Sequence, residues 1–202
     1  MTARVGKVVT SGVFSLDGQD FDVDNNIWLV GDDDEVLVID AAHDAAPIAA
    51  AVAGRRVTAI VLTHGHNDHI NAAVPLRDLT GAPIWFNPAD RMLWDMVYPD
   101  ASPDEELGDG TRFEVAGVTL TALATPGHSP GSTCLYAAAL KTVFTGDTLF
   151  HGGPGATGRS YSDEATILNS IRTRLLTLDG TTVVRTGHGE DTTIGAEALH
   201  IP

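Results

Sequence analysis

The chain has 202 residues, of which 43% are hydrophobic, and its formal net charge at pH 7 is −15. This length and hydrophobic content suit one domain spanning residues 1–202. The acidity argues against nucleic acid or an anionic membrane as a partner. Because Cys134 is the one cysteine, an intrachain disulfide is excluded. With no secretory signal and no membrane-spanning stretch in the sequence, we expect a cytoplasmic protein.

Short segments rich in β-branched residues and broken by glycine or aspartate predict strands in the first part of the chain. These strands cover residues 5–14, 25–31 and 35–40, with an acidic hairpin turn at 32–35. The alanine-rich segment 46–54 predicts a helix that ends at a glycine. The nearly continuous apolar run 57–63 predicts a strand buried on both faces. Residues 70–79 are expected to be helical.

The second part of the chain repeats this mixture of strands and helices. We expect a strand at 82–86, a helix at 88–97, a polar loop at 100–110, a hairpin at 111–125, strands at 132–139 and 141–147, an amphipathic helix at 163–178, and a last strand with a loop at 181–189. Two strand-rich halves that each carry helices favour two sheets packed face to face with helices outside.

Four segments share one pattern, in which an apolar strand runs into a glycine-rich turn that holds a polar side chain with a free lone pair. They are IVLTHGHNDH (60–69), LATPGHSPGS (123–132), VFTGDTLF (143–150) and VVRTGHG (183–189). Ligand sites commonly lie at the carboxyl ends of strands, where loops converge, and glycine lets the backbone approach closely. Five of the 8 histidines fall in these turns, and two aspartates accompany them.

Together the turns supply seven candidate metal ligands: His64, His66, Asp68, His69, His128, Asp147 and His188. Seven ligands are too many for one tetrahedral ion and suit two ions that share a carboxylate. All seven donors are nitrogen or oxygen and none is a thiolate. This donor set fits zinc, iron or manganese better than a metal that prefers thiolate ligands. A lone histidine in a turn is usually structural, but HxHxDH within one turn reverses that expectation.

Other residues lack this context. His43, His151 and His200 are left out of the predicted site, and Cys134 is interpreted as a buried strand residue. Asp40 ends the strand EVLVID; a hydrogen bond to a metal-ligating side chain and a turn-capping role are equally compatible with its position.

The motifs THGHNDH, TPGHSPGS, GDTLF and TGHG resemble the metallo-β-lactamase superfamily, and specifically its glyoxalase II-like branch. The motifs occur in the family's order from residue 63 to 189. The resemblance implies an α/β fold of the four-layer αββα sandwich type. It also implies that His64, His66 and His128 hold a first metal, that Asp68, His69 and His188 hold a second, and that Asp147 bridges them. Zinc is the expected ion at both positions.

The resemblance further implies hydrolysis of an acyl thioester of a low-molecular-weight thiol by a metal-bound hydroxide, which Asp68 orients. Some glyoxalase II enzymes add a C-terminal helical domain that supplies basic residues to glutathione. This chain ends at Pro202, so we expect that domain to be absent. Arg159 and Tyr161, in the loop after Asp147, are the candidate substrate-binding residues.

Three alternatives remain open. A persulfide dioxygenase on the same fold would use one iron held by His64, His128 and Asp147. A lactone, β-lactam or phosphodiester hydrolase is the second alternative. A periplasmic β-lactamase would need a leader, which we do not expect here, and the acidity argues against a nuclease. A non-enzymatic binding module would saturate its metal coordination and leave no open position.

Overall fold

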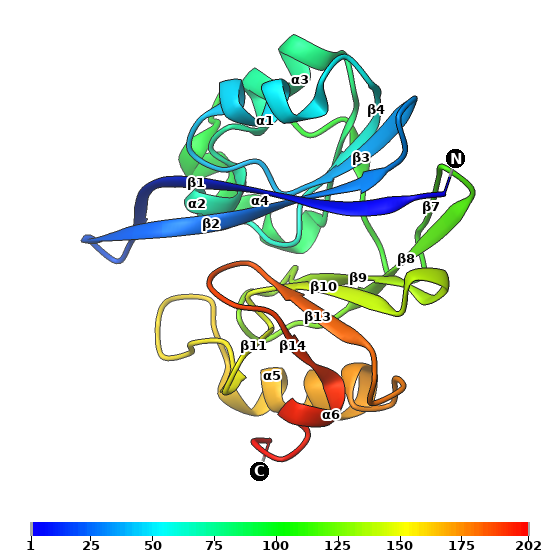
Figure 1. Ribbon diagram of the computed structural model, residues 1–202. Coiled ribbons are helices and arrows are strands. Elements are labelled where there is room, and N and C mark those ends of the chain that lie inside the picture. The colour runs from blue at the N-terminus through cyan, green and yellow to red at the C-terminus, as the bar shows by residue number, and fades with distance from the viewer. Residues whose placement is uncertain (1, 202) are drawn as a thin grey trace.

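The computed structural model describes residues 2–201 and consists of two six-stranded sheets that face each other (Figure 1). In the first sheet the strands follow chain order. They are β1 (Arg4–Leu16), β2 (Gln19–Gly31), β3 (Glu35–Ile39), β4 (Arg56–Val61), β5 (Ile84–Phe86) and β6 (Glu105–Glu106). The strands β1 to β3 pair antiparallel, whereas β3 to β6 pair parallel.

The second sheet has the order β14-β13-β10-β9-β8-β7, and only its β10–β13 pair is parallel. Its strands are β7 (Arg112–Val115), β8 (Val118–Ala124), β9 (Thr133–Ala137), β10 (Thr142–Gly146), β13 (Val183–Thr186) and β14 (Thr192–Thr193). A separate short hairpin joins β11 (Leu149–Phe150) to β12 (Gly153–Pro154).

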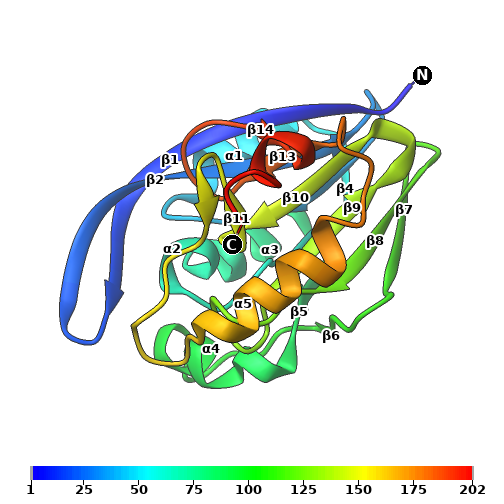
Figure 2. The ribbon, with the colours of Figure 1, turned by 90° about the horizontal axis from the view of Figure 1, so that it is seen from below.

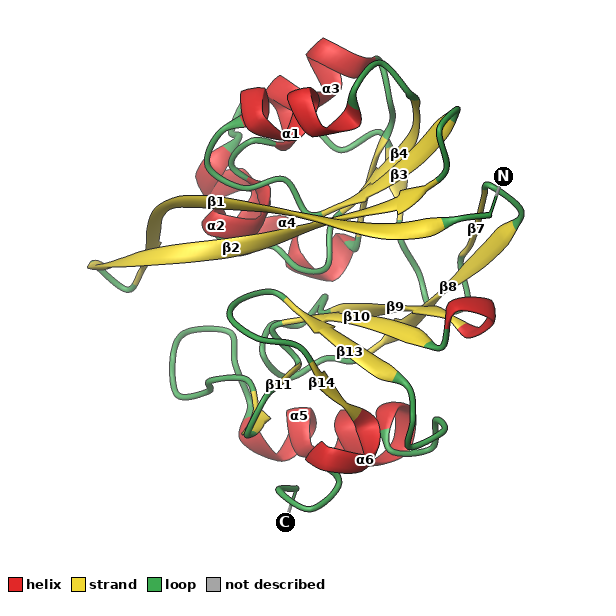
Figure 3. Cartoon of the chain, in the orientation of Figure 1, coloured by secondary structure: helices red, strands yellow, loops and turns green. Residues whose placement is uncertain are grey.

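Helices cover the outer face of each sheet, as Figure 3 shows. Those on the side of the first sheet are α1 (Ala45–Val52), α2 (Asn67–Ile70), α3 (Ala73–Thr80) and α4 (Arg91–Val97), preceded by the 3-10 turn η1 (Pro88–Asp90). Those on the side of the second sheet are α5 (Glu164–Ser170), the π-helical turn η3 (Ile171–Leu175) and α6 (Ile194–Glu197); the 3-10 turn η2 (Ala138–Leu140) connects β9 to β10.

Alternating side chains explain why four layers form. In β3, Val36 and Val38 pack toward the helices, whereas Leu37 and Ile39 pack into the layer between the sheets. A strand that is apolar at every position therefore buries both faces. On the other side, Ile167 of α5 packs against Val143 of β10 in a third apolar cluster. The expected αββα sandwich is confirmed, and Cys134 is fully buried in β9 as expected.

The first two strands are longer than the sequence analysis predicted. They run over 13 residues each and are joined by Asp17 and Gly18, whose φ angles of 55° and 71° form a tight turn. Aspartate followed by glycine is a strong hairpin signal, which the analysis did not use. The outer halves of β1 and β2, residues 11–24, form an arm that extends beyond the sheet (Figure 2). This hairpin arm carries mostly exposed polar residues, so its pattern resembles a loop.

Three further expectations need correction. The helix expected at 70–79 is divided into α2 and α3. The polar loop expected at 100–110 contains β6, which pairs with β5 as the edge strand of the first sheet. The helix expected at 163–178 is α5 followed by a π-helical turn. Among the described residues, no helix has the length and apolarity needed to cross a bilayer.

Candidate metal centre

Loops at the carboxyl ends of four strands bring the predicted ligands to one edge of the sandwich. His64 and His66 follow β4, His128 follows β8, Asp147 follows β10, and His188 follows β13. The loop after β13 can approach because residue 187 is glycine. A Cβ atom there would lie 2.2 Å from Asp147 Oδ1 and 2.8 Å from His69 Cε1. Every larger residue at this position would occupy the space of the candidate ligands.

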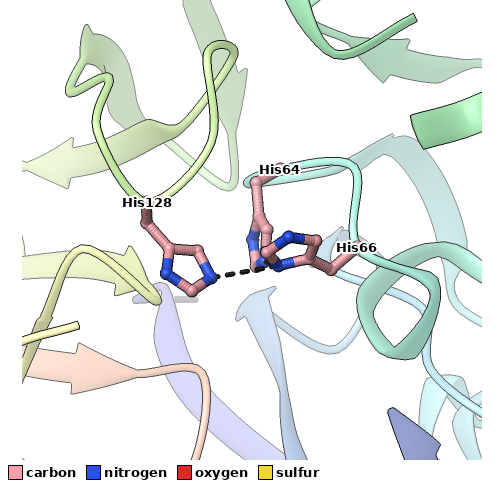
Figure 4. Close-up of side chains that lie close together, drawn as sticks. All are labelled: His64, His66 and His128. Carbon is pink, nitrogen blue, oxygen red and sulfur yellow. Dashed lines mark hydrogen bonds between the residues drawn. The ribbon is translucent and has the colours of Figure 1, made fainter. Parts of the chain in front are cut away.

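Three imidazoles converge in the first group (Figure 4). Nδ1 of His66 lies 3.1 Å from Nε2 of His64 and 3.0 Å from Nε2 of His128. All three side chains are buried, with exposed fractions of 8% or less. Three ring nitrogens that face one another at this distance can all be satisfied when a cation lies between them.

The second group contains Asp68, His69 and His188. Nε2 of His69 lies 3.2 Å from Nε2 of His188, and Nε2 of His188 lies 3.3 Å from Oδ2 of Asp68. Asp147 lies between the groups: its Oδ1 is 3.3 Å from Nε2 of His69, and its Oδ2 is 3.6 Å from Nε2 of His128. The structure therefore brings all seven candidate ligands together, in the two groups that the resemblance implies.

Backbone carbonyls orient two of the rings. Nδ1 of His128 lies 2.9 Å from the carbonyl oxygen of Ala156, and Nδ1 of His188 lies 2.7 Å from that of Asp24. A carbonyl oxygen only accepts, so each Nδ1 must carry the proton and donate it. With Nδ1 as the donor, Nε2 is the ring nitrogen that faces the cluster and can offer a lone pair to a metal ion.

The electrostatics of the two groups differ. Burial lowers the pKa of His66 to about 3, so this ring is neutral near pH 7. Burial opposes a charge on His188 as well, but the adjacent Asp147 carboxylate raises the pKa of His188 to about 10. Burial would raise the pKa of Asp68, yet His69 and His188 bring it down to about 2. Without ions, protonated imidazoles compensate the buried carboxylates; bound dications would take over that role and release those protons.

The donor set also passes a test of fit to metal ions. Asp68 Oδ1 and Asp147 Oδ1 are buried and have no hydrogen-bond partner. Buried carboxylate oxygens are rarely left unpaired, because desolvation without a partner costs about 1–3 kcal/mol or more. Both oxygens belong to residues of the candidate ligand groups, so an ion would satisfy them.

A sequence model described as the metallo-beta-lactamase superfamily matches residues 21–188. The chain belongs to this superfamily. The hydroxyacylglutathione hydrolase GloC of Haemophilus influenzae is 36% identical over 156 residues, which cover 71% of this chain and 74% of that protein. Membership identifies a metallo-hydrolase, and the histidine-rich groups identify a binding site for divalent metal ions.

Solved structures of the superfamily share the fold. The crystal structure of BLEG-1 B3 metallo-beta-lactamase has a TM-score of 0.81 and 28% identity, covering 96% of this chain and 98% of its own. The crystal structure of TTHA1623 in a di-iron-bound form has a TM-score of 0.75 and 32% identity. The match covers 89% of this chain and 95% of that one. That neighbour carries iron, so the superfamily fold by itself does not select zinc.

A cavity of about 450 Å³ opens beside this metallo-hydrolase site and is lined by His66, Asp68, His128, Asp147 and His188. Arg159 also lines it, as the sequence analysis expected of a substrate-binding residue. Tyr161 does not: it lies in a neighbouring hollow beside Ser160 and is 44% exposed. Of the two residues expected to bind the substrate, Arg159 lines this cavity and Tyr161 does not.

Asp40 links two ligands to one carboxylate. Its Oδ2 accepts from Nδ1 of His69 at 2.9 Å and from the hydroxyl of Thr63 at 2.9 Å. The same hydroxyl oxygen lies 3.1 Å from Nδ1 of His64 and can accept its proton. Asp40 thus directs Nε2 of His69 into the cluster, and through Thr63 it does the same for His64. Of the two roles considered for Asp40, the structure favours the hydrogen bond to a ligand.

We expect Asp40→Asn to weaken metal binding by about 10- to 100-fold, because the amide no longer fixes the protonation of His69. Asparagine tolerates the left-handed backbone at this position, where φ is 63°, so the substitution tests the carboxylate rather than the turn. Zinc affinity can be measured by competition with a chromophoric chelator. Asp44→Asn is a matched control, since Asp44 caps α1 from the surface and asparagine caps equally well. Equal zinc affinities of the wild type and Asp40→Asn would contradict the role given to Asp40.

Two residues beside the ligands were not predicted from the sequence. Asn25 of β2 is buried, and its Nδ2 donates to Asp68 Oδ2 at 3.0 Å. Its Oδ1 lies 2.8 Å from Nε2 of His43, a histidine that had been left out of the site. The available signal was two consecutive asparagines at the start of the apolar strand segment NNIWLVG, since buried amides need partners.

Proposed function

We propose that this metallo-hydrolase is a thioester hydrolase of the glyoxalase II type, with two zinc ions and an acyl thioester of a low-molecular-weight thiol as its substrate. The observation that carries the proposal is the pair of ligand groups joined by Asp147 beside an accessible cavity. The similarity to a hydroxyacylglutathione hydrolase supports the choice of reaction.

The metal ions, when bound, would supply an activated water at neutral pH and polarise the carbonyl that it attacks. The protein's own residues hold the reacting groups. Asp68 lines the cavity, and its buried Oδ1 has no hydrogen-bond partner, so this carboxylate is available to accept a proton from the activated water. Asn25 holds the other oxygen of this carboxylate, which fixes its orientation. Arg159 lies on the cavity wall, where it can pair with an anionic group of the substrate.

Metal content and substrate turnover test this proposal together. The protein is purified without chelator or added metal, and its ions are counted by elemental mass spectrometry. Close to two zinc ions per chain, with hydrolysis of a panel of thioesters, is the expected result. One iron per chain, with little zinc and with oxygen uptake on persulfides, would instead establish the dioxygenase alternative. Two ions with lactone hydrolysis and no thioester hydrolysis would also reject the proposal.

Zinc is expected to stabilise the metal-free protein against heat, because a ligand that binds only the native state raises its apparent stability. At free zinc 1,000 times the dissociation constant, the gain is about 4 kcal/mol for each site. Differential scanning calorimetry after chelation and zinc re-addition measures it. Magnesium is the control ion, since imidazole-rich sites bind it poorly. An unfolding temperature that zinc leaves unchanged would contradict a zinc site in this cluster.

A further inference from the structure

The hairpin arm places two aromatic side chains at the mouth of the cavity. Phe14 of β1 and Phe21 of β2 are directly opposite each other in the strand register, with ring centroids 6.2 Å apart and an interplanar angle of 28°. Both line the cavity, although Phe21 is 40% exposed. We call this pair the aromatic wall. Exposed aromatic rings that line a cavity are typical of surfaces that contact a ligand.

The arm is fastened on both sides, so the aromatic wall has a defined position. On one side, Asn67 donates to the carbonyl of Val13 at 2.8 Å and accepts from the amide of Ser15 at 2.8 Å. These two bonds flank Phe14, and Asn67 directly follows His66. The ring of Phe14 consequently lies 5.2 Å, centroid to centroid, from the ring of His66.

On the other side, the loop after β12 holds the arm. The guanidinium carbon of Arg159 lies 4.6 Å from the centroid of the Phe21 ring, and Nη1 of Arg159 donates to Gln19 at 3.0 Å. The amide of Ser160 donates to the carboxylate of Asp17 at 3.0 Å. The stacked guanidinium covers one side of the wall and keeps the rings in place.

The charged residues that line the cavity restrict the class of substrate that it can bind. Among the described residues that line it, Arg159 is the only lysine or arginine, and Asp22 adds an acidic group at the arm. A carrier with several carboxylates would therefore find one cationic partner and an acidic neighbour. A group without charge, in contrast, can displace water from two phenylalanine rings.

From this arrangement we propose that the substrate carries an apolar group, aromatic or branched aliphatic, which lies against Phe14 and Phe21 while its thioester carbonyl is at the metal centre. The inference rests on the proposed function and narrows its substrate class. The apolar group can belong to the acyl part or to the thiol. Both share one chemistry, and the experiment separates the two sources.

The test measures kcat/KM of the metal-loaded full chain on two pairs of thioesters. One pair varies the acyl part, S-acetyl against S-phenylacetyl N-acetylcysteamine. The other varies the thiol, S-acetyl N-acetylcysteamine against the acetyl thioester of benzyl mercaptan. We expect the aromatic member of at least one pair to be preferred by about tenfold or more, since burying such a group against apolar surface contributes on this scale. The pair that shows the preference identifies the source.

Phe21→Ala should reduce kcat/KM for the preferred aromatic substrate by about tenfold more than it reduces kcat/KM for the small substrate. Phe21→Leu, which keeps an apolar surface, should retain most of the preference. Val9→Ala is the control on the same hairpin: Val9 is 51% exposed and does not line the cavity, so this variant should behave as wild type. Unfolding temperatures of all variants show whether the arm stays folded.

Two results would overturn the inference while thioester hydrolysis stands: no preference in either pair, or a preference that Phe21→Ala leaves unchanged. If no thioester is hydrolysed, the proposed function fails, and calorimetry then tests the wall directly. The probes are two thioethers that cannot be hydrolysed, S-ethyl and S-(2-phenylethyl) N-acetylcysteamine. Tighter binding of the phenyl compound that is lost in Phe21→Ala would support the aromatic wall. Equal binding of the two compounds would reject it.

Discussion

Replacing His66 with alanine is expected to lower kcat/KM for thioester hydrolysis by at least about 100-fold while the fold persists. Nδ1 of His66 faces the ring nitrogens of His64 and His128 at 3.1 and 3.0 Å, so the variant removes the central member of the first ligand group. Burial holds the pKa of His66 at about 3, so the ring is neutral and its removal breaks no ion pair.

Four measurements check this result: kcat/KM, metal content per chain, and the circular dichroism and the unfolding curve of the metal-free protein. We expect the metal content to fall from about two ions per chain to about one and unfolding to remain cooperative. His200→Ala is the control, since His200 is exposed and belongs to none of the candidate ligand groups. Unchanged turnover in His66→Ala with two ions still bound would reject His66 as a metal ligand that hydrolysis requires.

Asp90→Ala is expected to lower the free energy of unfolding of the metal-free protein by about 3–5 kcal/mol, because it removes the carboxylate that accepts from two buried amides and a buried hydroxyl. Asp90 has no exposed surface. Its carboxylate accepts from the amide of Gly65 at 2.8 Å, from the hydroxyl of Ser129 at 2.6 Å and from the amide of Gly131 at 2.6 Å. Gly65 lies between His64 and His66, and Ser129 follows His128, so one carboxylate joins the two loops of the first metal group.

The same variant should weaken zinc binding by about 10- to 100-fold, since the histidines lose their relative positions. Chemical denaturation and chelator competition measure the two effects. Asp95→Ala in the helix α4, which follows Asp90, is the matched control: Asp95 is exposed and pairs with Arg91, so we expect a change within about 0.5 kcal/mol. Asp90→Ala with wild-type stability and wild-type zinc affinity would show that these bonds do not hold the loops.

The hairpin arm is a part of the fold that the hydrophobic pattern of the sequence does not predict. Residues 11–24 contain serines, aspartates and glycines, and most of them are exposed, so hydrophobic alternation gives little indication of a strand. The strands continue because each residue pairs with its opposite across the hairpin, from Leu16 and Gln19 back to Arg4 and Gly31. Backbone hydrogen bonds between two strands form whatever the polarity of the side chains. The Asp17–Gly18 turn is the local sequence feature that indicates this long hairpin.

Arg159 and Tyr161 illustrate the same limit within the site. They are two residues apart in one loop and have comparable chemistry for binding a polar group. The structure directs Arg159 over the rings of the aromatic wall and leaves Tyr161, with a φ of 70°, outside the cavity. A loop without regular backbone repeats gives no rule for which side chains face inward.

The layered architecture and the candidate ligands could be predicted from local patterns. These patterns are apolar strands buried on two faces, and histidines or aspartates in glycine-rich turns at strand ends. The way in which those ligands are held could not be predicted, because it depends on contacts between segments that are far apart in the sequence. Asp90 binds loops 25 and 41 residues away in sequence, and Asn25 reaches Asp68 across 43 residues. Such contacts depend on which backbone amides and carboxylates the folded chain brings within hydrogen-bonding distance, and no local pattern records that geometry.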